Sequence, residues 1–172
     1  MIKQPLKIST ARALTRRDFL WLSSTAAAGY LFGCATDPVT GKKQLMLVSE
    51  DTEVKIDQQY SPMQISSDYG TVQDSQLNSY VSQVGSKMAA KSHRAHMPYS
   101  FRVVNATYVN AYAFPGGTIA ATRGIMLSLE NEAELAALLG HELGHVNARH
   151  SAEQMSKGML TQAVVGGVSV LA

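Results

Sequence analysis

Only one cysteine and one tryptophan occur among the 172 residues of this sequence. The single cysteine, Cys34, excludes an internal disulfide and any metal cluster built from several cysteines. Charge is also scarce, at 16% of residues with a net charge of +2. The basic excess lies in residues 1–33, which balance to +4 and leave −2 for the rest, so no nucleic-acid-binding surface is predicted. No apolar run reaches the roughly 20 residues of a membrane-spanning helix.

The first 33 residues are predicted to be an export signal rather than a folded element. The stretch "TRRDFLWL" places Arg16 and Arg17 ahead of an apolar run that ends at "LFGC". It resembles a twin-arginine signal joined to a lipoprotein box, in which Cys34 is acylated and becomes the new N-terminus. The alternative is an uncleaved anchor helix with an incidental Cys34. Both predict membrane attachment facing a bacterial periplasm or exterior, and Ala35, by analogy with lipoprotein sorting, favours the outer membrane.

The remaining chain divides into a predicted tether, residues 34–48, and residues 49–172, the N-terminal part of a domain. The stretch "ATDPVTGKKQ" is polar and is interrupted by Pro and Gly, which is typical of a tether or loop. Ser49 is predicted to begin a helix that Pro62 ends. A second helix is predicted over residues 75–91, because apolar side chains recur there at spacings of four, three and four. They are Leu77, Val81, Val84 and Met88.

Two short strands are predicted in "SFRVV" and "GTIAATRG", where residue character alternates. Between them, "NAYAFPGG" contains residues that favour turns, so we expect a hairpin-like edge. A long helix is then predicted to begin at an Asn131 cap and to continue through "SAEQMSKG". This order of helices and strands indicates the α+β class.

The stretch "HELGH" within the long helix has the residues of a zinc site. His141 and His145 are four apart and share a helix face, where two imidazoles can bind one tetrahedral zinc at roughly 2.0–2.1 Å. Glu142 lies about 100° further round, where it can take a proton from zinc-bound water. Gly140 and Gly144 each cost about 1 kcal/mol in a helix, which suggests that another segment approaches closely. The alternative is a chance motif with solvated histidines.

The block "NAYAFPGGTIAATRGIM…NEAELAALLGHELGHVNARHS" resembles the HtpX-like zinc metallopeptidases (peptidase family M48), which include CAAX-prenyl proteases and periplasmic quality-control peptidases. The resemblance implies a zincin-like fold of the gluzincin type, with the active-site helix packed on a small β-sheet. His141 and His145 then correspond to zinc ligands and Glu142 to the catalytic residue. An edge strand that binds peptide in extended form is also implied. The residues that lead to this strand are Ala113, Phe114, Pro115, Gly116 and Gly117.

The third ligand of this family, a glutamate from a later helix, has no counterpart in the sequence. Glu153 lies 12 positions past His141, about 18 Å along a continuing helix. His150 is expected roughly 140° off the ligand face, so an exposed or hydrogen-bonded histidine near a helix end is the better interpretation. Residues 158–172 form an apolar tail. We therefore expect a C-terminally truncated part of a longer protease.

Three functions are compatible with these features. The first is a zinc-dependent metalloendopeptidase with one Zn²⁺ per domain, lipid-anchored on the periplasmic side and degrading misfolded or misassembled envelope proteins. The second is a non-catalytic envelope module that holds unfolded client proteins on the strand edge. The third, an unrelated structural lipoprotein, leaves the histidines unexplained.

Overall fold

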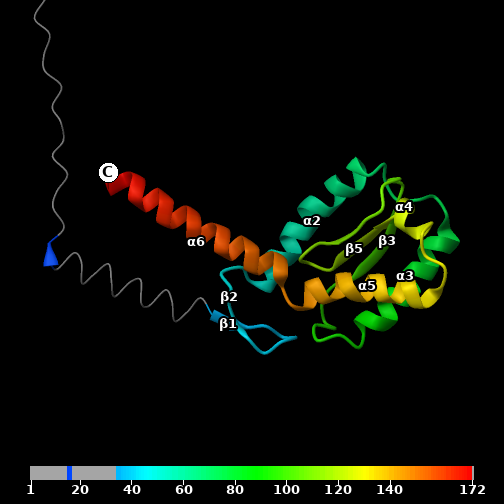
Figure 1. The fold of residues 1–172 in the computed structure, drawn as a ribbon, viewed down its shortest axis with the longest axis horizontal. Coiled ribbons are helices and arrows are strands. Elements are labelled where there is room, and N and C mark those ends of the chain that lie inside the picture. Colours follow the sequence, from blue (N-terminus) through cyan, green and yellow to red (C-terminus); the bar gives the residue numbers. More distant parts are fainter. Residues whose placement is uncertain (1–14, 17–33, 172) are drawn as a thin grey trace, which may run out of the picture.

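The computed structural model describes Thr15, Arg16 and residues 34–171, so the export signal expected over residues 1–33 lies almost wholly outside the described residues. Helices pack around a small sheet and α6 runs outward from them (Figure 1), so the protein is α+β as the sequence predicts. The helices are α2 Glu50–Ser67, α3 Ser75–Ala89, α4 Arg123–Met126, α5 Glu132–Asn147 and α6 His150–Leu171. The strands are β1 Cys34–Thr36, β2 Lys43–Leu45, β3 Ser100–Val104, β4 Ala111–Ala113 and β5 Thr118–Thr122.

The main sheet has three strands in the order β3-β5-β4. The two strands expected from the sequence are β3 and β5, but they pair in parallel, with Ser100 opposite Thr118. The hairpin joins β5 instead to β4, a strand that the sequence analysis missed, with Ala113 opposite Ile119. A strand of three residues, Ala111–Ala113, is too short to show the period-two pattern of a strand. The turn chemistry was therefore recognised, but it was assigned to the wrong pair of strands.

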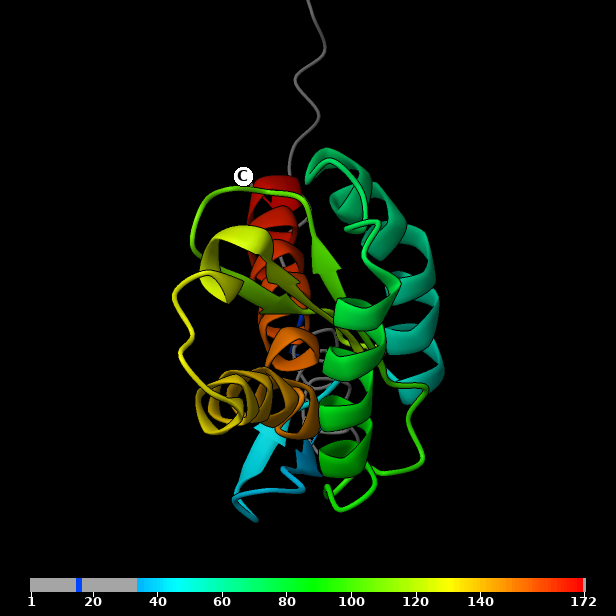
Figure 2. The same cartoon turned by 90° about the vertical axis from the view of Figure 1, so that its right-hand side faces the viewer.

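Helices α3 and α5 cover one face of the sheet (Figure 2). Their apolar side chains belong to the same buried cluster as those of β3 and β5. The predicted face of α3 is confirmed, with Val81 and Val84 buried. Helix α2 lies on the other face, where Ile65 packs against Val104 and Ala120. The remaining buried members of the first cluster are Ala89, Phe101, Val103, Ile119, Leu135, Leu139, Leu143 and Val146.

Helix α2 begins as predicted, with the Ser49 hydroxyl accepting a hydrogen bond from the Thr52 amide. The expected end at Pro62 is wrong, because α2 continues to Ser67. A proline inside a helix removes one hydrogen bond and crowds the preceding turn. Its ring is exposed here, and the opposite side of α2 is fixed by the body of the protein, so the helix continues past it. The end comes at Tyr69, which has a positive φ of 62°.

Residues 34–45 form a short antiparallel hairpin, β1–β2, rather than the tether or loop expected. Its turn is closed by Asp37, whose carboxylate accepts hydrogen bonds from the Val39 amide and the Thr40 hydroxyl. Burial raises the pKa of Asp37, but these hydrogen bonds outweigh it and hold the pKa below its ordinary value. The Gln44 amide donates to the carbonyl of Ala148 at 3.2 Å. The hairpin is thus attached to the end of α5.

The long helix expected from Asn131 onward is interrupted, so that prediction is wrong in its second half. Helix α5 ends at Asn147, and Ala148 forms its C-cap. Arg149 has a positive φ of 57°, a left-handed conformation in which a helix cannot continue. A new helix, α6, begins at the next residue, His150.

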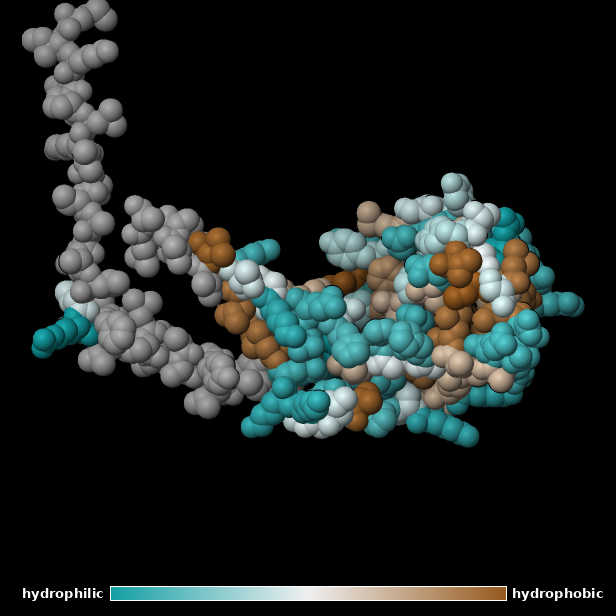
Figure 3. All heavy atoms as spheres, viewed as in Figure 1, coloured by the Kyte–Doolittle hydropathy of each residue, from teal (hydrophilic) through white to brown (hydrophobic). Residues whose placement is uncertain are grey.

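Helix α6 leaves the body, and its described side chains include exposed apolar ones (Figure 3). Met159 and Leu160 are each 51% exposed, and Val165 is 64% exposed. Within the described part of the chain, no helix is both long enough and apolar enough to cross a membrane.

The contact between α3 and β3 provides a test of this fold. A Cβ added at Gly85 would lie 2.4 Å from the ring of Phe101. Gly85→Ala is therefore expected to lower the free energy of unfolding by about 1–3 kcal/mol, because the ring is buried and cannot move freely. Gly158→Ala in α6 is the control, because nothing lies within 4 Å of its added Cβ. Equal stability of the two variants in urea unfolding would contradict this packing.

Candidate metal centre

Helix α5 presents two histidines to solvent while its opposite side is buried. Its N-terminus is capped by Asn131, whose side chain accepts a hydrogen bond from the Glu134 amide at 3.0 Å. Leu139 and Leu143 lie in the core on one side. His141 and His145 lie on the exposed side, one helical turn apart.

The two histidine rings approach one another through the same type of nitrogen. Nε2 of His141 lies 3.1 Å from Nε2 of His145, and the ring planes are 85° apart. Two vertices of a tetrahedron with metal–nitrogen bonds of about 2.0–2.1 Å are roughly 3.3–3.4 Å apart. The two nitrogens therefore fit as two ligands of one zinc ion with little movement.

Glu142 lies beside this pair on a different side of the helix. Its side chain is 8% exposed, whereas both neighbouring histidines of the motif are exposed. This difference follows from the rotation of about 100° per residue in an α-helix. Within the described residues no group of three or more His, Cys, Asp or Glu side chains is placed to hold a metal. Glu153, which the sequence analysis rejected as a ligand, pairs with Lys157 at 2.8 Å.

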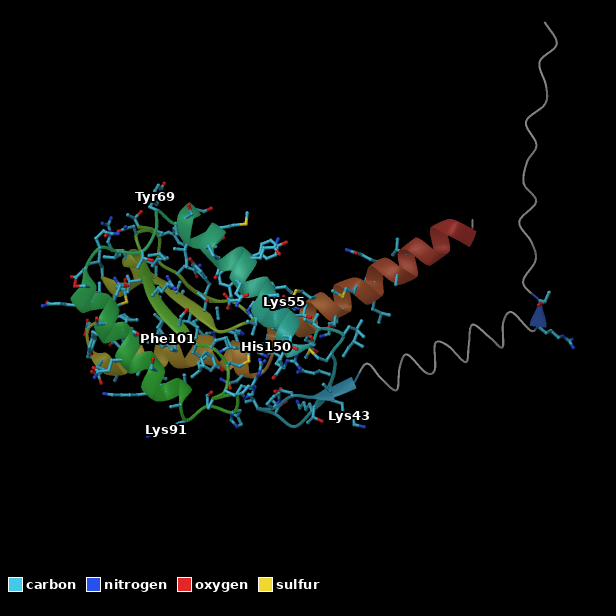
Figure 4. The ribbon with its side chains drawn as sticks, turned by 180° about the vertical axis from the view of Figure 1, so that it is seen from behind. Lys43, Lys55, Tyr69, Lys91, Phe101 and His150 are labelled. Atoms are coloured by element: carbon cyan, nitrogen blue, oxygen red, sulfur yellow. The ribbon has the colours of Figure 1, made fainter. Side chains whose placement is uncertain are left out.

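His150 is closer to the site than the sequence analysis expected. Its Nδ1 lies 2.7 Å from Nδ1 of His145. The expected position 140° off the ligand face assumed a continuous helix, but the left-handed Arg149 brings His150 back beside α5. Figure 4 shows His150 where α5 gives way to α6. The interpretation as a hydrogen-bonded histidine near a helix end agrees with this contact.

The two glycines beside the histidines differ in their surroundings. A Cβ at Gly140 would lie 3.0 Å from Cε of Met88 in α3, so a neighbouring helix does approach there. Nothing lies within 4 Å of a Cβ at Gly144. The expected close approach is therefore correct at Gly140 and wrong at Gly144.

The segment expected to lie near an edge strand does contact the histidine helix. Ala113, Phe114 and Pro115 line a cavity of about 10 Å³ together with His145. This volume is close to that of a single water molecule, so the two segments are nearly in contact. The added Cβ of Gly116 would overlap Asp57, at 2.5 Å from its Cβ, and Gly117 has a positive φ of 110°. Both positions therefore favour glycine.

Among the described residues, β4 pairs with a strand on one side, that of β5. The Thr122 amide donates to the carbonyl of Asn110, and the Phe114 amide donates to that of Thr118. Because hydrogen-bonded pairs alternate along an antiparallel ladder, the backbone groups of Ala111 and Ala113 point away from β5. They are available to pair with an added strand.

The sequence analysis missed a row of buried carboxylates on α2. Glu53 is fully buried, and its Oε2 accepts hydrogen bonds from Arg94 at 2.8 Å and Arg149 at 3.1 Å. One turn later, Asp57 accepts a hydrogen bond from the Thr118 amide at 2.8 Å. The sequence offered one signal for these buried carboxylates, namely that Glu53 and Asp57 are four residues apart in a helix with few apolar residues. Carboxylates in such a helix usually face solvent, so the signal does not predict burial.

The two arginines also bind backbone at the ends of the elements that they join. Arg94 Nη1 donates to the carbonyl of Val146, in the last turn of α5, at 2.7 Å. Arg149 Nη2 donates to the carbonyl of Val48 at 2.8 Å. The Arg94 amide donates to Asn147, whose own amide donates to the carbonyl of Leu143. Three segments therefore meet at the end of α5.

A third carboxylate, Asp68, follows α2 and holds the start of β4. It accepts hydrogen bonds from the hydroxyls of Tyr112 at 2.6 Å and Tyr108 at 2.8 Å. Burial raises the pKa of Asp68, but the hydrogen bonds from Tyr112, Gln64 and Tyr108 outweigh it and keep the pKa below its ordinary value. The ionised form of Asp68 is thus favoured by the folded state.

The chain is similar to several proteases. The model of "Peptidase family M48" matches residues 75–172. A putative beta-barrel assembly-enhancing protease of Vibrio cholerae is 33% identical over 105 residues, which are 59% of this chain and 22% of that protein. The mitochondrial metalloendopeptidase OMA1 of Schizosaccharomyces pombe is 30% identical over 150 residues, which are 81% of this chain and 43% of that protein.

The family match covers the part of the chain that carries the pair of converging histidines on α5. Because the match spans more than half of the chain, this protein belongs to peptidase family M48, a family of zinc metallopeptidases. The resemblance found in the sequence is thereby confirmed. The chain spans less than half of the length of either relative.

Arg149 offers a test of the junction between α5 and α6. Arg149→Ala removes the guanidinium that donates to Glu53 and keeps a Cβ in the left-handed conformation. It is expected to lower the free energy of unfolding by about 1–3 kcal/mol. Arg149→Gly removes the same guanidinium but relieves the backbone strain, and should be about 1–2 kcal/mol more stable than Arg149→Ala. Urea unfolding measures both. Equal stabilities would contradict the left-handed conformation.

Asp68 predicts a dependence of stability on pH. Its pKa is lower in the folded state, so its contribution is complete above the unfolded pKa of about 3.9 and is lost as pH falls through the folded pKa. Asp68→Asn should cost about 1–3 kcal/mol at pH 6 and much less at low pH. Tyr112→Phe should weaken the same dependence. A cost that does not change between about pH 6 and about pH 2.5 in urea unfolding would contradict the assignment.

Proposed function

We propose that this protein is a zinc-dependent endopeptidase that cleaves misfolded or misassembled proteins of the bacterial envelope. The observation that carries the proposal is the 3.1 Å approach of the Nε2 atoms of His141 and His145, next to the segment that leads out of an edge strand. The named function of the Vibrio cholerae relative, beta-barrel assembly enhancement, supports an envelope substrate.

Each residue of the motif has one role in this proposal. His141 and His145 hold zinc through their Nε2 atoms, within a zincin-like arrangement of helix and sheet. When bound there, zinc would act as a Lewis acid and would lower the pKa of a water molecule to near 7. Glu142 takes the proton from the attacking water and later gives it to the leaving amine. Its low exposure, 8%, keeps bulk water from competing for the carboxylate.

Substrate binding is assigned to the edge strand and the turn that follows it. The free backbone groups of Ala111 and Ala113 pair with an extended peptide, which adds to the sheet as a further strand. Phe114, Pro115, Gly116 and Gly117 hold this strand against the histidine helix. Recognition through backbone groups tolerates many sequences, as is needed for unfolded clients.

Membrane attachment is assigned to Cys34, acylated after removal of residues 1–33. Cys34 is the first residue of β1, and the hairpin that it begins is hydrogen-bonded through Gln44 to the carbonyl of Ala148 at the end of α5. Just after the hairpin, the Leu47 amide donates to the hydroxyl of Ser156 in α6. An acyl chain on Cys34 would therefore hold the histidine helix close to the membrane surface. We favour the outer membrane and the periplasmic side.

A second candidate function is a non-catalytic module that binds unfolded clients on the edge of β4. The observation in its favour is that β4 lies at the edge of the sheet in the described part of the chain, where its backbone can pair with an extended peptide without a metal. Binding of an unfolded protein that survives both chelation and loss of Glu142 would favour this function.

The decisive variant is Glu142→Gln. The purified protein is expected to bind zinc and to cleave an unfolded protein such as reduced casein. The variant should also bind zinc, but it should cleave at least about 10²-fold more slowly because the general base is lost. Zinc is measured by metal analysis, and cleavage by electrophoresis.

The matched control is Glu130→Gln, which changes an exposed carboxylate ahead of α5. It should leave both zinc content and cleavage unchanged. Cleavage by Glu142→Gln at the normal rate would refute the mechanism. A metal-free protein that still binds casein would instead support the second candidate function.

A further inference from the structure

We propose that His150 is a positioning residue for His145, which it orients through the ring nitrogen that faces away from His141. The proposal rests on the proposed function in one respect, namely that His145 is a metal ligand. It goes beyond that function because it assigns a role to a histidine outside the HExxH motif.

The geometry places His145 between two other imidazoles. Its Nε2 lies 3.1 Å from Nε2 of His141, and its Nδ1 lies 2.7 Å from Nδ1 of His150. The ring centroids of His145 and His150 are 4.9 Å apart, with ring planes at 66°. Both nitrogens of His145 are therefore engaged, one on the side of the candidate metal and one on the side of α6.

The hydrogen bond to His150 selects the form of His145 that binds a metal. A neutral imidazole carries its proton on one nitrogen and a lone pair on the other. When His145 donates from Nδ1–H to Nδ1 of His150, the lone pair of His145 is on Nε2, which faces His141. Metal-binding histidines in general hold their second nitrogen to a partner in this way, which fixes the tautomer and the ring orientation.

The backbone conformation of Arg149 places His150 beside His145. In a continuous helix, a residue five positions after His145 would lie roughly 140° away around the axis. The left-handed backbone of Arg149, φ 57°, turns the chain so that His150 meets His145. This conformation is strained in any residue other than glycine. The hydrogen bonds from the side chain of Arg149 to Glu53 and to the carbonyl of Val48 offset this strain.

The end of α5 is held from the other side by Arg94. Its guanidinium donates to the carbonyl of Val146, which in a continuous helix would accept from the amide of residue 150. The same guanidinium contacts Glu53. One buried carboxylate thus binds both Arg94, which donates to the Val146 carbonyl, and Arg149, which turns the chain toward His150.

The test replaces His150 with two side chains that separate shape from hydrogen bonding. His150→Phe keeps a planar ring but has no acceptor, whereas His150→Gln keeps an acceptor on a flexible chain. His150 is exposed, so both variants should fold. The matched control is His93→Phe, which changes an exposed histidine that precedes β3.

The first measurement uses the metal-free protein with ¹⁵N-labelled histidine, at a pH of about 8.5 where imidazoles are neutral. In the unchanged protein, His145 should show one tautomer, with the proton on Nδ1. In His150→Phe the ring should show a mixture of both tautomers, while His150→Gln and His93→Phe should keep the single form. A single Nδ1–H tautomer in His150→Phe would overturn the proposal.

The second measurement is zinc affinity by competition with a chelator. His150→Phe should weaken zinc binding about 10–100-fold, which is the usual effect of removing a partner of a metal-binding histidine. His150→Gln should recover most of this loss, and His93→Phe should change nothing. Equal weakening by Phe and Gln would overturn a role through hydrogen bonding.

The two proposals fail in different ways. If zinc binds and Glu142→Gln is inactive, but His150→Phe changes neither tautomer nor affinity, the positioning role is wrong and the proposed function stands. If the unchanged protein binds no zinc but its His145 tautomer depends on His150, the proposed function is wrong and the positioning contact stands.

Discussion

The fold depends most on one buried carboxylate, that of Glu53. Its side chain has no exposure to solvent, and Arg94 and Arg149 both donate hydrogen bonds to it. A buried carboxylate of this kind is tolerated only with such partners, because an unpaired charge is costly to bury. The three residues come from α2, from the segment between α3 and β3, and from the junction of α5 with α6. One acceptor therefore fixes the relative positions of three segments that lie far apart in the sequence.

The candidate metal centre is built on this arrangement. The histidines belong to α5, whereas the edge strand and its turn belong to the sheet. Helix α2 is linked to the end of α5 through Arg94 and Arg149, and to the start of β5 through Thr118. Glu53 binds the arginines at the end of α5, and Asp57, one turn later, binds the Thr118 amide next to the turn. Two carboxylates one turn apart on α2 thus bind the segment that adjoins the histidine helix and the segment that follows the edge strand.

Some of this was predictable because the forces are local. The pairing of His141 with His145 follows from helix geometry alone, as does the apolar face of α3. The end of α2 was not predictable in the same way. Pro62 disfavours a helix locally, but α2 continues past it because its buried side is fixed by carboxylates whose partners lie elsewhere. The parallel pairing of β3 with β5 also escaped prediction, because alternation identifies a strand but not its neighbour.

The sequence by itself determined the chemistry of the site: two imidazoles one helical turn apart, an adjacent carboxylate, and glycines that permit a tight turn. These are consequences of residue identity and short spacing. Only the tertiary structure decided where α5 ends and what lies beside His145. Arg149 takes a left-handed conformation that is unfavourable for an isolated chain, and it does so where a distant glutamate and a distant carbonyl bind its side chain. Such a balance between local strain and long-range hydrogen bonds exists only after the segments have come together.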